Sequence, residues 1–131
     1  MHIEYFTFNP FQERTCIVSD EAGFCAFVDP GCYGQEELSR ITDFVNRQGL
    51  KPVCIMLTHA HFDHIYGMSA LAKEYEIPVY AHMGEMFTLE TTNPAVCEAY
   101  GLPLPDTFPM IKSLSDAHIG SRFYHVSRFD T

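Results

Sequence analysis

Residues 58–64 read Thr-His-Ala-His-Phe-Asp-His, and this stretch decides how the rest of the sequence is interpreted. It places three histidines and one aspartate within six positions, which makes four candidate metal ligands in one short segment. Such a cluster is costly in a turn unless each imidazole and carboxylate finds a partner. The apolar run 53–57 ends just before it and is typical of a strand covered on both faces. Because ligands in layered α/β folds gather at strand ends, we predict a metal site here.

The spacing within the cluster suits two metal ions. His59 and His61 are two residues apart, so in an extended turn both side chains point the same way and could clasp one metal. Asp63 and His64 follow at a distance that suits a second metal. Nitrogen and oxygen donors without cysteine favour Zn²⁺, with Mn²⁺ or Fe²⁺ as alternatives. The competing interpretation is a set of solvated loop histidines without a ligand.

Apolar periodicity on either side of the cluster predicts alternating strands and helices. The segments 35–48 and 67–75 have helical spacing, a short helix is expected at 84–90, and Gly49 is placed to cap the first of these helices. Segment 93–109 holds four prolines and is expected to be mostly loop, and no period is visible from about residue 113 onward. The expected strands are 3–8, 14–19, 24–28, 53–57 and 77–81, the second and third forming a hairpin. This order indicates an α/β (α+β) domain with a mixed sheet and helices on its outer face.

Composition narrows the functional classes. The chain has 131 residues and a net charge of −9, with eight scattered lysines and arginines, so nucleic acid binding is not expected. No apolar stretch has the length of a membrane span, and the first residues do not resemble a signal peptide. Five cysteines without a C-x-x-C spacing indicate free thiols in a reducing compartment. We therefore expect a cytoplasmic protein.

The segment Thr58–His64, with Gly67 three residues further on, resembles the signature of the metallo-β-lactamase superfamily. Asp29-Pro30-Gly31 resembles the turn that often precedes it in this family, and a predicted helix and strand lie between the two. The resemblance covers residues 1–90, whereas 91–131 are loop-rich, and together they form one partial domain, 1–131. It implies the N-terminal half of an αββα sandwich. One face of the half-sandwich sheet would then lie open and favour a homo-oligomer.

The same resemblance implies roles for the motif residues. His59 and His61 would hold the first metal, and Asp63 and His64 the second. A hydroxide between the metals would attack the substrate, and Asp63 would act catalytically by orienting it or accepting its proton. The motif with two paired histidines resembles the motif found in the hydrolytic branch of the family. Among its members the motif most resembles the glyoxalase II-type thioesterases, so the expected substrate is a small ester or thioester.

Several residues depart from the family pattern or have two interpretations. The family takes further ligands from its second half, and neither His118 nor His125 lies in the expected Gly-His turn. A catalytically inactive, metal-binding chain is therefore the alternative to an active hydrolase. Asp29 either orients a ligand histidine or simply forms the turn. His82 is expected near the site without ligating, and Cys32 lacks an evident histidine partner for a nucleophile.

Overall fold

The computed structural model describes residues 1–106 and 111–113, and within them a single mixed sheet runs in chain order from β1 to β6. The first three strands pair antiparallel, and β3 through β6 pair parallel. The strands are β1 (His2–Phe8), β2 (Glu13–Ser19), β3 (Phe24–Val28), β4 (Lys51–Leu57), β5 (Val79–Ala81) and β6 (Ile111–Ser113). The predicted mixed sheet, including the hairpin of its second and third strands, is confirmed.

Two of the helices were predicted from their apolar spacing. These are α1 (Gly34–Gln48) and α2 (Met68–Tyr75). Gly49 ends α1 in the left-handed conformation, at φ 64°, and its N–H bonds to the last turn of the helix. This cap, predicted from the sequence, leaves the chain free to enter β4 two residues later.

The prediction of a loop over 93–109 was wrong for its first part. A third helix, α3 (Asn93–Tyr100), occupies it, preceded by the short helical turns η2 (Met83–Glu85) and η3 (Thr88–Thr92), where one short helix over 84–90 was expected. Pro94 lies in the first turn of α3, where its missing N–H costs nothing, and Gly101 ends the helix at φ 65°. The first of the four prolines that suggested a loop therefore marks the start of a helix.

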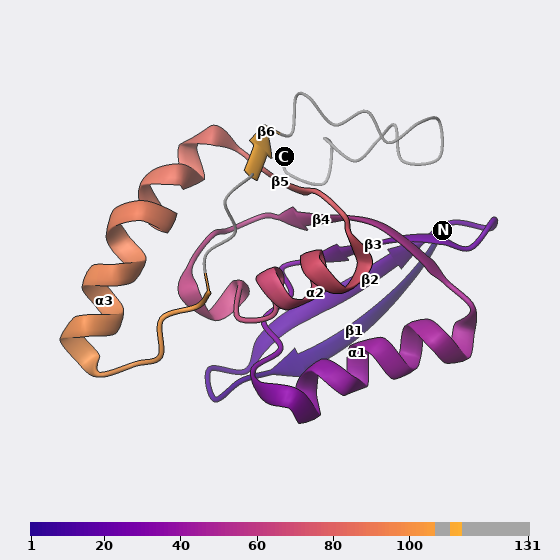
Figure 1. Ribbon diagram of the computed structural model, residues 1–131, viewed down its shortest axis with the longest axis horizontal. Helices are drawn as coiled ribbons and strands as arrows, with labels where there is room; N and C mark the ends of the chain where they lie inside the picture. Colours follow the sequence, from indigo (N-terminus) through magenta and orange to yellow (C-terminus); the bar gives the residue numbers. More distant parts are fainter. Residues whose placement is uncertain (107–110, 114–131) are drawn as a thin grey trace.

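Helices α1 and α2 lie on the same side of the sheet (Figure 1). Ile41 and Val45 of α1 and Leu71 of α2 are buried in one cluster with Phe27 and Ile55 of the sheet. Phe27 and Ile55 are paired across β3 and β4, so they belong to one row of side chains on this face. The predicted helical layer on one face of the sheet is thus confirmed.

The other face of the sheet carries a second apolar cluster, whose members all lie in strands. The sequence predicted an open face here, but its central residues are 0–9% exposed: Val18, Ala26, Val28, Cys54, Met56 and Tyr80. Association of copies through this face stays a prediction.

The parallel pairing of β3 and β4 positions the candidate site. Val28 pairs with Met56, so both strands end at the same edge of the sheet. The N–H of Asp29 donates to the carbonyl of Met56 at 2.9 Å and extends this pairing by one residue. The turn after β3 and the histidine-rich segment after β4 therefore leave the sheet side by side.

Candidate metal site

Asp29 joins the two loops that leave this edge of the sheet. Its Oδ1 accepts the N–H of Thr58 at 2.7 Å, and Oδ2 contacts the Thr58 hydroxyl. Asp29 has φ 51° and is 6% exposed, so it forms a turn and is also buried against the motif. Asp29 therefore forms the turn after β3, which is one of its two interpretations. Its carboxylate also holds Thr58, the first residue of the motif, so the residue is more than a turn former.

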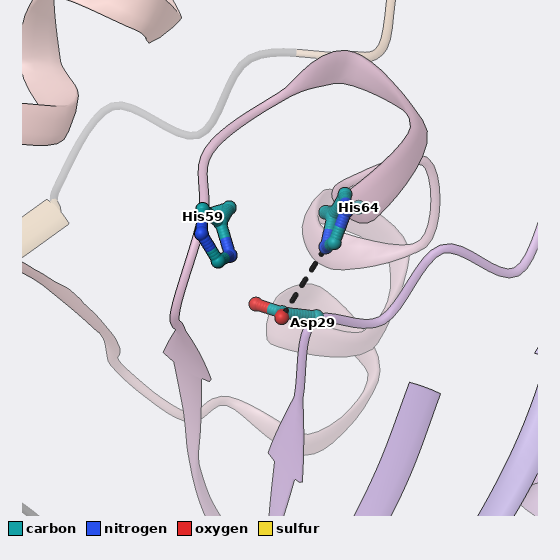
Figure 2. A group of neighbouring side chains, drawn as sticks. All are labelled: Asp29, His59 and His64. Atoms are coloured by element: carbon teal, nitrogen blue, oxygen red, sulfur yellow. Dashed lines mark ion pairs between the residues drawn. The ribbon is translucent and has the colours of Figure 1, made fainter. Parts of the chain in front are cut away.

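Asp29, His59 and His64 converge on one point (Figure 2), and each offers a ligand atom within 4.8 Å of the other two. Asp29 lies just beyond the end of β3 and His59 just beyond the end of β4, while His64 faces them from the end of the short helical turn η1 (Phe62–His64). The Asp29 Oδ2 is 3.3 Å from the Nδ1 of His64. The Thr58 hydroxyl lies 3.1 Å from the Nδ1 of His59, which links this ring to Asp29 as well.

His61 and Asp63 lie beside this group. The His61 ring is 5.9 Å from the His59 ring and 6.3 Å from the His64 ring, measured between centroids. The Oδ2 of Asp63 is 3.8 Å from the Nε2 of His64. All four predicted ligands are therefore neighbours. Among the described residues, however, the group whose ligand atoms all lie within 4.8 Å of one another consists of Asp29, His59 and His64, without His61 or Asp63. The assignment of His59 with His61 to one metal, and Asp63 with His64 to another, stays a prediction.

Three carboxylates surround the His64 ring. Besides Asp29 and Asp63, the Oε1 of Glu13 lies 3.6 Å from Nδ1. The contact with Asp29 is the largest cause that raises the pKa of His64 above its usual 6.5, and burial of the ring opposes this. The carboxylates of Asp29 and Asp63 beside this one imidazole favour a cation at this place, whether a proton or a metal ion.

Glu13 is the buried acid that the sequence analysis missed. It is 4% exposed, and its Oε2 accepts the Thr15 hydroxyl at 2.8 Å, while its Oε1 has no hydrogen-bond partner among the described residues. Burial raises the pKa of Glu13 from 4.5 to about 8. A signal was present, since Glu13, Thr15 and Ile17 alternate along β2 and all face the core.

Close packing of the two loops depends on Gly31. A Cβ at this position would overlap the Glu13 carboxylate and the carbonyl oxygen of Asp63. Asn9 connects the same two loops, because its Nδ2 donates to the carbonyl of Gly31 at 3.0 Å and to the carbonyl of Asp63 at 2.8 Å. Asn9 carries no signal of this role in the sequence, because it lies far from the motif in the chain.

The remaining candidates do not add donors to this group. Burial raises the pKa of the Cys32 thiol to about 12, so Cys32 is unsuited to act as a nucleophile. His82 is exposed, directly precedes η2 and lies outside the set that shares a ligand distance. His118 and His125 fall outside the described residues. None of the helices in residues 1–106 and 111–113 has the length and apolar character needed to cross a membrane.

The donors fit a divalent transition metal. Two imidazoles and one carboxylate within a shared ligand distance form the nitrogen and oxygen set that Zn²⁺, Mn²⁺ and Fe²⁺ accept. His61 and Asp63 lie near enough to extend the set. The fold and this cluster define the class: an α/β protein with a candidate metal centre at one edge of its sheet.

Comparison with known proteins names the family. The model of the metallo-β-lactamase superfamily matches residues 11–126, and the chain belongs to this superfamily. It is 39% identical over 69 residues to the probable metallo-hydrolase YqgX of Bacillus subtilis, a match that covers 53% of this chain and 30% of the relative. It is 29% identical over 83 residues to a hydroxyacylglutathione hydrolase of Nitrosomonas eutropha, covering 63% of this chain and 31% of the relative.

Solved structures agree with the fold. The B3 metallo-β-lactamase BLEG-1 superposes with a TM-score of 0.74 at 26% identity, covering 88% of this chain and 54% of that one. The protein TTHA1623, solved in a di-iron-bound form, gives a TM-score of 0.70 at 31% identity, covering 85% of this chain and 53% of that one. The chain thus spans about half the length of these two structures and less than a third of the two curated relatives.

Proposed function

We propose that this chain binds a divalent metal ion, with Zn²⁺ as the preferred ion, and that the site belongs to a hydrolase of small thioesters or esters. The observation that carries the proposal is the convergence of Asp29, His59 and His64 at the carboxyl ends of β3 and β4. His59, His61, Asp63 and His64 are the proposed ligands. A bound Zn²⁺ polarises a carbonyl and lowers the pKa of a bound water to about 7.

The chain's own residues have three tasks in this proposal. Asp29 orients His64, whose Nδ1 lies 3.3 Å from its Oδ2, and holds Thr58 directly before His59. Its carboxylate also lies within ligand distance of both histidines and is a further candidate ligand. Glu13, whose Oε1 lies 3.6 Å from the Nδ1 of His64, restricts the position of that ring. In this proposal Asp63, which is partly exposed beside His64, takes a proton from the attacking water.

The substrate class rests on similarity. Curated relatives named hydroxyacylglutathione hydrolase, from Nitrosomonas eutropha and Nitrosomonas europaea, match the region that holds the motif. Their name denotes hydrolysis of a glutathione thioester, so a small acyl-glutathione thioester is the substrate to test first. A cytoplasmic location, where glutathione is reduced, fits this substrate and is proposed with it.

The alternative is a chain that binds metal without turnover. It is favoured by the small number of donors that share a ligand distance in the described residues, since a catalytic metal needs fixed geometry.

Hydrolysis of S-lactoylglutathione by the 131-residue chain, with added Zn²⁺, Mn²⁺ or Fe²⁺, distinguishes the two. Turnover that disappears in Asp63→Ala supports the hydrolase. Tight metal binding with negligible turnover supports the alternative. Absence of metal binding contradicts both.

A further inference from the structure

One residue of the motif is held by side chains from a distant part of the chain. Ala60 lies between His59 and His61 and is 0% exposed. Its N–H donates to the Oε1 of Glu85 at 2.7 Å, across 25 residues of sequence. Its carbonyl accepts the Nδ2 of Asn93 at 2.7 Å, across 33 residues. Both partners come from the segment that contains η2, η3 and α3.

These two hydrogen bonds act on the two peptide groups that connect the histidines. The N–H of Ala60 belongs to the peptide that joins it to His59, and the carbonyl belongs to the peptide that joins it to His61. Because a peptide group is planar, a hydrogen bond to one polar atom of each restrains how far both planes can turn. The backbone positions from which the His59 and His61 side chains project depend in part on those planes.

The surroundings make the two contacts hard to replace. Asn93 is 2% exposed and Ala60 is fully buried, so water has little access to the carbonyl if the amide is removed. Segment 58–61 is neither helix nor strand, so regular secondary structure does not hold its backbone. Orientation of the two histidines therefore depends on side chains outside the motif.

We propose that Glu85 and Asn93 are positioning residues, which set the orientation of His59 and His61 for a metal ion by holding both polar groups of Ala60. This inference rests on the proposed metal site. Residues that hydrogen-bond to the ligands of a metal typically change its affinity by about 10–100-fold when they are lost. Glu85 and Asn93 act one step further out, through the peptide groups that join Ala60 to the two histidines, so we expect a loss of about 10-fold. Losses of this size are expected for Asn93→Leu, which keeps the side-chain shape without a donor, and for Glu85→Ala.

The test makes two measurements on each variant. The first is the Zn²⁺ dissociation constant, obtained by competition with a chromophoric chelator, and the second is the absorption spectrum of the Co²⁺-loaded protein. Glu85→Gln keeps an acceptor oxygen and should bind like the wild type, as should the matched control Glu90→Gln at an exposed position of η3. Far-UV circular dichroism of the metal-free variants establishes that they fold. Since Glu85 is only half-buried, Glu85→Ala keeps the test decisive if Asn93→Leu fails to fold.

Weaker Zn²⁺ binding and an altered Co²⁺ spectrum in folded Glu85→Ala, with recovery in Glu85→Gln, support the proposal. Wild-type affinity and spectrum in folded Glu85→Ala and Asn93→Leu would overturn it. A Glu85→Gln variant as weak as Glu85→Ala would also overturn it, because the carboxylate charge would then matter rather than the hydrogen bond. If the wild type itself binds no metal, the proposed function fails, which is a different outcome.

Discussion

Glu13→Gln tests the electrostatics beneath the site. The Glu13 side chain is buried, and its pKa rises from 4.5 to about 8. An acid with a raised pKa contributes its full stability below pH 4.5 and loses it as the pH rises through about 8. Each pH unit in this window costs about 1.4 kcal/mol, so wild type should lose roughly 2.5 kcal/mol from this residue between pH 5 and pH 7.

Glutamine has the same shape and does not titrate. Its amide can donate to the Thr15 hydroxyl, which Glu13 already contacts at 2.8 Å. The unfolding free energy of Glu13→Gln, minus that of wild type, should therefore increase by roughly 2.5 kcal/mol between pH 5 and pH 7. Urea unfolding of the metal-free proteins in chelator at both pH values measures this difference. Glu21→Gln, in the exposed turn after β2, is the matched control and should show no such increase. A difference for Glu13→Gln that stays constant with pH refutes the reasoning.

Three further predictions concern packing and the support of the motif. Gly67→Ala should destabilise the protein by about 1–3 kcal/mol, because a Cβ there would overlap the Cys32 Sγ; unchanged thermal unfolding would show that the loops can separate without cost. Asn9→Gly fits the positive φ of 52° at this position but removes the donors to Gly31 and Asp63, so we expect weaker Zn²⁺ binding by calorimetry, and equal affinity would contradict a supporting role. In metal-free protein, Asp29→Asn should lower the His64 pKa, because the Asp29 carboxylate is the largest cause that raises it; NMR titration of the ring decides, and an unchanged pKa contradicts that cause.

The elements that the sequence predicted correctly have a local signal. Strand β4 and helix α1 follow from their own apolar patterns, and the end of α1 follows from Gly49. Helix α3 was missed because the four prolines of segment 93–109 resemble a loop. Only Pro94 lies in the helix, and its position in the first turn cannot be recognised until the helix is known.

The residues of the candidate site also differ in whether the sequence carries a local signal for them. His59, His61, Asp63 and His64 are contiguous, so their density is visible in the sequence. Their supports, Glu13, Asn9, Glu85 and Asn93, reach the motif through tertiary contacts from three different segments. No periodicity connects an asparagine at the start of a helix with a carbonyl more than thirty residues away. Asp29 lay between the two cases, because its turn was visible but its contact with His64 depends on the parallel pairing of β3 and β4.

The central claim is that the motif holds a metal, and metal analysis after dialysis tests it most directly. Wild type and a His59→Ala/His61→Ala double variant would be loaded with Zn²⁺, dialysed together and analysed for bound metal by mass spectrometry, with circular dichroism to establish that both fold. Both histidine side chains are exposed, so their removal should leave the core intact. We predict that wild type retains Zn²⁺ and that the double variant loses most of it. Equal zinc in the two proteins would contradict the assignment of the metal site to this motif.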